Sequence, residues 1–240
     1  MPLSWSDLAV ASVAVIVGAL VQGSVGFGLG MVAAPTLMLI DQRMVPAPLL
    51  VVSMILTVLM THREWHAIDF PGLTWALGGR VAGVVAGATM LTLLSGDAIA
   101  IVFGALVLMA VGLTASGLHV VPRRATLVGA GALSGFMGTV SSIGGPPMAL
   151  LYQHAAGPRI RGTLSVFFVL GTGLSLLALW FIGRLGAAEL ALAAALVPGT
   201  VLGFALSGRA RRVLDGGYTR RAVLSVAAAA GLLVLLRSVI

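Results

Sequence analysis

Two glycine-rich runs carry most of the residues in this chain whose types and spacing could bind a ligand. The first is Gly23-Ser-Val-Gly26-Phe-Gly28-Leu-Gly30. The second starts at Gly135 and ends in Gly144-Gly145-Pro146-Pro147. Proline is favoured in the first turn of a helix because it has no N–H to leave unsatisfied, so a short helix is predicted from near Pro146 to about Gln153. The free N–H groups at such a helix start bind anions.

We therefore predict an anion-binding site built from both runs. Its backbone N–H groups and hydroxyls are expected to hold the substrate, and small glycines permit close approach. The candidate substrate-binding residues are Gln22, Gly23, Ser24, Gly26, Gly28, Gly30, Gly138, Thr139, Ser141, Ser142, Gly144, Gly145 and Pro146. Close helix packing is the alternative explanation of such residues, and it is the interpretation we prefer for Gly83 and Gly87.

The composition indicates that the elements positioning these runs are membrane helices. Apolar residues make up 59% of the chain, charged residues 9%, and the mean hydropathy is +1.12, whereas a soluble domain carries about 25% charged residues. An all-α integral membrane protein is expected. Apolar segments of spanning length are predicted at 45–61, 72–95, 98–117, 163–183, 188–206 and 222–239.

The stretches 8–40 and 126–153 are also apolar, but each is interrupted by one of the glycine-rich runs. Each interruption leaves two arms that are predicted to be too short to span comfortably. A break of this kind persists in a membrane only where protein buries it or where it lines a cavity. The two stretches are therefore predicted to be broken or re-entrant helical hairpins.

The two interrupted stretches are related to each other by an internal repeat. One ungapped shift of 112 positions places Gly23 on Gly135 and Pro35 on Pro147, and it also places Ser95-Gly96 on Ser207-Gly208. We interpret this as a duplication with halves at 1–120 and 121–240. Each half is predicted to hold one hairpin and three transmembrane helices.

The basic residues indicate how the halves are oriented, and all fourteen are arginine. If each hairpin enters and leaves on one side, the second half is inverted. One side of the membrane then collects Arg63, Arg80, Arg123, Arg124, Arg159, Arg161, Arg209, Arg211, Arg212, Arg220 and Arg221, and the other keeps Arg43, Arg184 and Arg237. The positive-inside rule favours this biased arrangement. It predicts a multi-pass protein of a bacterial inner membrane with both termini outside.

Arg80 follows Gly78-Gly79 and is expected just inside the start of a helix. It could pair with an anion, but we prefer to interpret it as a residue that snorkels to the basic side. Arg161 is likewise interpreted as a topology residue. The chain's acids fall at predicted segment ends or in loops, so no proton carrier or sodium-binding carboxylate cluster is indicated.

Several classes of function are excluded or disfavoured by residue usage. The chain has no cysteine, and its four histidines show no metal-ligand spacing, so no metal and no cofactor are expected. No catalytic constellation is present, which argues against an enzyme. The arginines do not form one stripe, so nucleic acid is not an expected partner.

The expected partners are a small anionic substrate and the lipid bilayer, and the oligomeric state stays open. No cleaved signal peptide is expected, since no basic stretch precedes the first apolar run.

The paired motifs resemble the sulfite exporter TauE/SafE family. The resemblance rests on Gly23 to Gly30 with Pro35, and on Gly135-Phe-Met-Gly138 through Gly144-Gly145-Pro146-Pro147 with Leu151-Tyr152. Arg161-Gly-Thr163 resembles members with a Gly-Pro-Pro variant of the second motif. The resemblance implies a small permease that exports a small sulfur-containing anion such as sulfite or an organosulfonate.

Other functions remain open at this stage. A permease for small carboxylates or amino acids would use a similar site, and a channel would replace alternating access with a continuous pore. A non-transporting scaffold is the third possibility. Neither the direction of transport nor a coupling ion is indicated by the residues.

Overall fold

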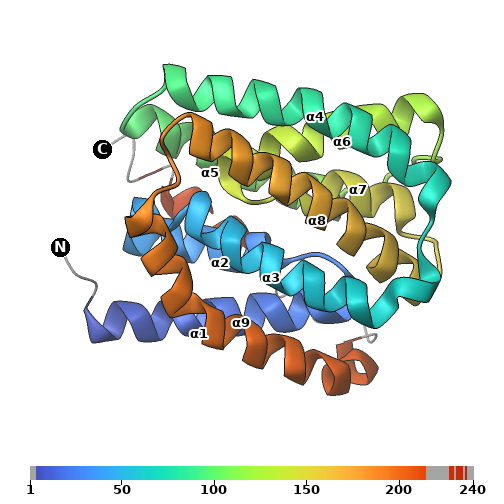
Figure 1. Cartoon of the computed structure of the whole chain (residues 1–240), viewed down its shortest axis with the longest axis horizontal. Coiled ribbons are helices and arrows are strands. Elements are labelled where there is room, and N and C mark those ends of the chain that lie inside the picture. Colours follow the sequence, from blue (N-terminus) through green and yellow to red (C-terminus); the bar gives the residue numbers. More distant parts are fainter. Residues whose placement is uncertain (1–3, 215–226, 230, 235, 237–240) are drawn as a thin grey trace.

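The chain folds into a bundle of helices around two short, broken segments (Figure 1). The computed structural model describes residues 4–214, 227–229, 231–234 and 236, and these contain no strand. The helices, in chain order, are α1 (Trp5–Val25), α2 (Leu29–Ile40), η1 (Gln42–Met44), α3 (Ala47–Glu64), η2 (Trp65–Ala67), α4 (Phe70–Leu93), α5 (Asp97–Ala115), α6 (Arg124–Ser141), α7 (Gly145–Tyr152), α8 (Gly157–Phe181) and α9 (Ala187–Leu214).

Within the described residues, six helices are long and apolar enough to cross a membrane. Five of them, α3, α4, α5, α8 and α9, overlap the five predicted spans from 45–61 to 188–206. The sixth is α1, whose 21 residues extend about 30 Å at 1.5 Å per residue. The prediction that both arms of the first interruption are short is therefore wrong for α1, because the helix continues through Gly18 and Gly23 to Val25. The predicted span 222–239 lies mostly outside the described residues.

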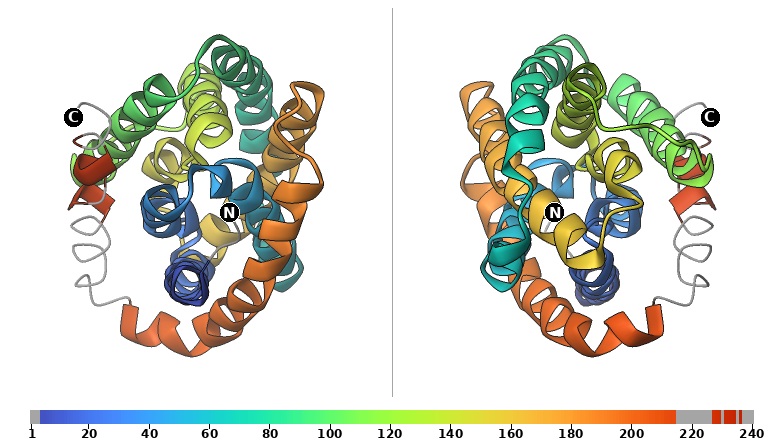
Figure 2. Two further views of the ribbon diagram at one scale, coloured as in Figure 1. Left: turned by 90° about the vertical axis from the view of Figure 1, so that its left-hand side faces the viewer. Right: turned by 90° about the vertical axis from the view of Figure 1, so that its right-hand side faces the viewer.

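Each glycine-rich run breaks a helix and turns the chain back. α1 is followed by the 12-residue α2, and α6 is followed by the 8-residue α7, as predicted for the short helix after Gly145. Viewed along the helices, α2 and α7 lie inside the set of longer helices (Figure 2). Most residues of both are buried, so protein covers the broken backbone and shields it from lipid.

Helices from the two halves of the chain pack against one another. α4 lies along α6, α1 lies along α9, and α3 lies along α8. Glycines allow the closest of these approaches, because a Cβ at Gly83 would overlap the carbonyl oxygen of Ala132 on α6. A Cβ at Gly203 would likewise overlap the carbonyl oxygen of Ile16 on α1. The packing interpretation of Gly83 is thus confirmed.

This packing predicts opposite effects for two glycines of α4. Gly83→Ala is expected to lower the free energy of unfolding by about 1–3 kcal/mol, because the added methyl group forces α4 and α6 apart. Gly78→Ala is the matched control, since nothing lies within 4 Å of its Cβ position. Replacing that glycine lowers the backbone entropy of the unfolded chain, which is expected to raise the free energy of unfolding by about 0.5–1 kcal/mol. Thermal unfolding in detergent measures both, and equal effects would contradict the close approach.

Charged and aromatic side chains mark the two ends of the bundle. The Arg-rich end comprises the ends of α3 and α9 and the starts of α4, α6 and α8, with Arg63, Arg123, Arg124, Arg159, Arg161 and Arg209. The opposite end carries Arg43 and Arg184. Trp65 and Phe70 are exposed at the Arg-rich end, and Trp180 and Phe181 at the opposite end. Aromatic side chains gather in this way at the two interfaces of a membrane.

Candidate functional site

Glycine conformations make the first helix break possible. α1 ends at Val25 and α2 starts at Leu29, and the turn between them contains Gly26 at φ 111° and Gly28 at φ 133°. Residues with a Cβ atom rarely adopt these backbone angles. Gln22 stabilises the turn, since its Oε1 accepts a hydrogen bond of 3.0 Å from the N–H of Leu29. One donor of the α2 start is therefore satisfied from α1.

The second break is built differently. α6 ends at Ser141, and Ser142 adopts the left-handed conformation with φ 62°. Its Oγ donates a hydrogen bond of 3.0 Å to the carbonyl oxygen of Pro46. Gly144 is the N-cap residue of α7, and Pro146 and Pro147 follow in the first turn. A non-glycine residue with positive φ is strained by roughly 1 kcal/mol or more, and such strain clusters at functional sites.

The two breaks meet in the interior of the bundle. A Cβ at Gly30 would overlap the carbonyl oxygen of Ser142, and a Cβ at Gly145 would lie 2.9 Å from the Cβ of Phe27. The N-termini of α2 and α7 therefore lie close together. Each helix start contributes a partial positive charge, so their meeting point favours an anion.

A small cavity of about 30 Å³ lies at this meeting point. That volume holds a water molecule or two in the present conformation. Residues of both breaks and of α3, α4 and α8 surround it: Gln22, Phe27, Gly28, Gly30, Met31, Leu50, Ser53, Arg80, Gly138, Ser142, Ile143, Gly144, Gly145, Phe168 and Thr172.

Arg80 supplies a full positive charge to this cavity. Arg80 lies near the middle of the apolar helix α4, and only 1% of its surface is exposed. Its Nη1 donates a hydrogen bond of 2.8 Å to Ser134 Oγ, and that hydroxyl donates one of 2.5 Å to the carbonyl oxygen of Gly144. The guanidinium is thereby fixed beside the N-terminus of α7.

Aromatic rings and glycines shape the rest of the Arg80 environment. The guanidinium carbon lies 4.8 Å from the ring centre of Phe167 and 5.7 Å from that of Phe168, distances at which a cation is attracted to a ring face. Gly171 on α8 leaves room for the side chain, because a Cβ there would overlap Arg80 Nε.

No carboxylate among the described residues pairs with Arg80. Its Nε is buried without a hydrogen-bond partner. A charged side chain inside a membrane protein is costly unless something neutralises it, and it marks a functional site by default. The interpretation of Arg80 as a snorkelling residue is therefore wrong: α4 continues through Gly78 and Gly79 and carries Arg80 into the interior.

The structure brings part of the predicted site set to the cavity. The predicted residues that line it are Gln22, Gly28, Gly30, Gly138, Ser142, Gly144 and Gly145. The others contact protein elsewhere. Gly23 and Ser24 lie against Ser207, and Gly26 lies against Ile160 and Arg161.

Two hydroxyls of the predicted set are also committed to other partners. Thr139 Oγ1 pairs with Ser175 Oγ at 2.9 Å, and Ser141 Oγ donates to the carbonyl oxygen of Met137 at 2.7 Å. Pro146 is buried next to the lining glycines. The cavity residues absent from the predicted set include Arg80, Phe27 and Thr172. Of these residues, Arg80 could have been found from the sequence, because an arginine near the centre of the apolar segment 72–95 is itself a functional signal.

Breaks that face each other from two helical hairpins, with an arginine between them inside a membrane bundle, define a class of protein. They are typical of membrane transporters that hold an anion near the midplane. Comparison with known families gives the same class: a family model described as Sulfite exporter TauE/SafE matches residues 10–234. The chain belongs to the sulfite exporter TauE/SafE family, and it is a membrane transporter and not an enzyme. No curated protein and no solved structure matches it significantly.

Proposed function

We propose that this protein carries a small sulfur-containing oxyanion, such as sulfite or an organosulfonate, across a bacterial inner membrane, and that it works as an exporter. The anion is bound between the N-termini of α2 and α7 and is neutralised by Arg80. The observation that carries the proposal is the buried Arg80 guanidinium, which no described carboxylate neutralises. Family membership supports the sulfur-anion class of substrate.

Charge and geometry support an oxyanion as the ligand. A guanidinium presents planar N–H donors that match the spacing of oxygens on such an anion. Helix N-termini add backbone donors that need no side chain. The cavity of about 30 Å³ is small, so binding is expected to move neighbouring groups apart.

We propose that the two halves, 1–120 and 121–240, are inverted repeats. Under the shift of 112 positions, α4 corresponds to α9 and α6 to α1. The contacts between helices are reciprocal in the same way, since α4 packs on α6 and α9 packs on α1. Such reciprocity is what a two-fold relation between the halves requires. The arginine distribution then supports an Arg-rich end in the cytoplasm and both termini outside.

Ligand-induced thermal stabilisation tests the substrate assignment. Purified protein is heated with sulfite, thiosulfate, sulfoacetate, taurine, sulfate, acetate or lactate. A ligand that binds the folded state at about 100 times its dissociation constant adds about 2.7 kcal/mol of stability. Stabilisation by a sulfur oxyanion is expected. Stabilisation by acetate or lactate alone would indicate a carboxylate permease, and no response in folded protein would favour a channel or a scaffold.

A matched pair of variants locates the binding. Thr172 lines the cavity, whereas the hydroxyl of Thr139 pairs with Ser175. Thr172→Val is expected to reduce the ligand-induced shift, and Thr139→Val is expected to leave that shift unchanged. The reverse pattern would place the anion outside the cavity.

A further inference from the structure

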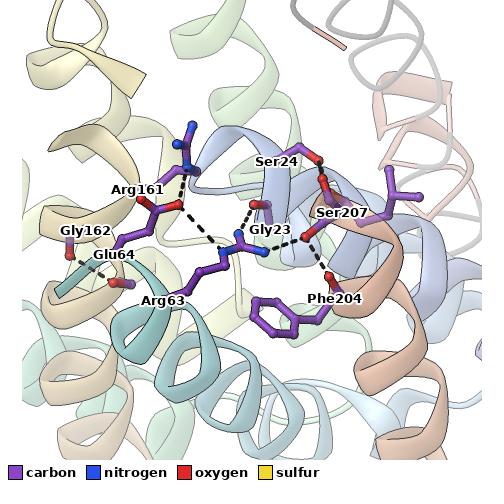
Figure 3. A network of polar contacts seen from close by, with 10 residues as sticks. Gly23, Ser24, Arg63, Glu64, Arg161, Gly162, Phe204 and Ser207 are labelled. Carbon is purple, nitrogen blue, oxygen red and sulfur yellow. Dashed lines mark hydrogen bonds and ion pairs between the residues drawn. The ribbon is translucent and has the colours of Figure 1, made fainter. Parts of the chain in front are cut away.

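A second polar cluster lies at the Arg-rich end, beside the first helix break (Figure 3). Arg63, near the end of α3, donates through Nη2 to the carbonyl oxygen of Gly23 on α1. Its Nη1 donates a hydrogen bond of 3.0 Å to Ser207 Oγ on α9. Its guanidinium carbon lies 4.5 Å from the ring centre of Phe204. One side chain thus holds three helices together.

Glu64 joins this arginine to a second one. Its Oε1 accepts a hydrogen bond of 2.9 Å from Arg161 Nε on α8 and lies 3.6 Å from Arg63 Nε. The side chains are 24% exposed for Arg63, 10% for Glu64 and 13% for Arg161. Two guanidinium groups therefore share one carboxylate, and the cluster of these three residues has a net positive charge.

The cluster lies directly behind the first helix break. Gly26 packs on the cluster, because a Cβ there would lie 3.4 Å from the Cα of Arg161. Phe27, the residue after Gly26, lines the cavity and packs against Gly145. The turn between α1 and α2 therefore contacts both the charged cluster, at Gly26, and the cavity, at Phe27.

The symmetry-related positions carry no charged side chain. Under the proposed duplication, Arg63, Glu64 and Arg161 correspond to Ser175, Leu176 and Leu49. Apolar residues can join helices without the cost of desolvating charges, which a buried ion pair must offset. Among the described residues, the charged cluster thus has no counterpart at its symmetry-related positions, so a merely structural joint there does not require charge.

We infer that Arg63, Glu64 and Arg161 form a gate that closes the Arg-rich end in this conformation. The inference rests on the proposed anion transport. The Glu64 carboxylate occupies the position between two guanidinium groups that a transported oxyanion also fits. An anion arriving there takes the place of Glu64, so that the helices separate without leaving either arginine unpaired.

The absence of cysteine from the sequence allows a direct test. Thr172→Cys places a single thiol at the cavity. Its rate of reaction with a membrane-impermeant maleimide is measured in right-side-out and in inside-out membrane vesicles, without substrate. Glu64→Gln, which keeps the shape but removes the charge, is expected to raise the rate from the Arg-rich side at least about tenfold, as loss of a charged hydrogen bond shifts the closed population. The rate from the opposite side should not rise.

Further variants separate gating from misfolding. Arg161→Gln breaks the same ion pair and should also raise the rate, and the exchange Glu64→Arg with Arg161→Glu should restore slow labelling. Asp41→Asn is the control. It removes an ion pair at the opposite end, where Arg43 hydrogen-bonds Asp41 and lowers the pKa of that carboxyl, so that the pair is ionised. Its rate from the Arg-rich side should not change.

An unchanged rate in folded Glu64→Gln protein would overturn the gate, as would an equal rise in Asp41→Asn. Because labelling needs no substrate, failure of the gate leaves the thermal-shift test of anion binding unaffected. Failure of anion binding, in turn, does not alter the labelling result.

Discussion

Arg80→Met is expected to abolish anion transport while making the ligand-free protein more stable. The substitution removes a buried charge that no described carboxylate neutralises and keeps an unbranched apolar chain in its place. Replacing buried charged groups with apolar residues of similar volume is often stabilising, by about 1–4 kcal/mol. Anion affinity should fall about 100-fold, since the ligand loses its charged hydrogen bonds.

Two measurements on the Arg80→Met protein check this. Thermal unfolding without ligand should shift upward, and sulfite should no longer add stability. Uptake of labelled anion into proteoliposomes should fall to the background of empty vesicles. Arg124→Met is the control, because Arg124 lies at the exposed start of α6 and contacts Trp75. Unchanged anion binding in Arg80→Met protein would remove Arg80 from the site.

Arg80→Lys distinguishes charge from geometry. Lysine keeps the positive charge but lacks the planar fork of donors. Ser134 Oγ accepts its hydrogen bond from a particular guanidinium nitrogen, and an ammonium group cannot reproduce this bond and face the cavity as well. An intermediate affinity is expected.

Gly171→Val is expected to have the second largest effect, although Gly171 itself does not line the cavity. Its Cβ would overlap Arg80 Nε, so the guanidinium must leave its position between Ser134 and the phenylalanine rings. Overpacking of this kind costs about 1–3 kcal/mol of stability. Anion binding should be lost together with the displaced charge.

A double-mutant cycle with Arg80→Met isolates this contact. If the clash with Arg80 causes the loss of stability, Gly171→Ala should cost less in the Arg80→Met background, by about 0.5–3 kcal/mol. Gly173→Ala is the matched control on the same helix, where the nearest atom is the flexible end of Met54 at 3.3 Å. Additive effects of Gly171→Ala and Arg80→Met would contradict the proposed role of Gly171.

Composition and the glycine runs were enough to predict the class of the protein and the approximate positions of its helix breaks. Low charge and high hydropathy leave lipid as the solvent for most of the surface, so the all-α membrane fold follows from composition. Glycine runs and Pro146-Pro147 interrupt helices for local reasons, which is why α7 begins at Gly145, next to the predicted start near Pro146. The paired motifs indicated the TauE/SafE family, and the match over residues 10–234 confirms it.

Tertiary packing decided which polar residues face the cavity. A helix that is apolar on all sides carries no signal of its rotation, so Ser141 and Ser142 could not be told apart in sequence. In the structure, Ser141 bonds back to Met137 within α6, and Ser142 leaves the helix and lines the cavity. The sequence also did not show the exact turn at which each helix breaks, because a membrane helix can continue through a glycine, as α1 does.

An arginine within an apolar segment is a signal in the sequence, but only the tertiary structure shows where the Arg80 side chain lies. Gly78 and Gly79 suggested a helix start, which would have placed Arg80 near the membrane surface. Contact with α6 at Gly79 and Gly83 keeps α4 continuous instead. Space for the side chain comes from Gly171 and a partner from Ser134, both more than fifty residues distant in the chain. Such long-range contacts leave no local pattern, because each depends on how separate helices pack.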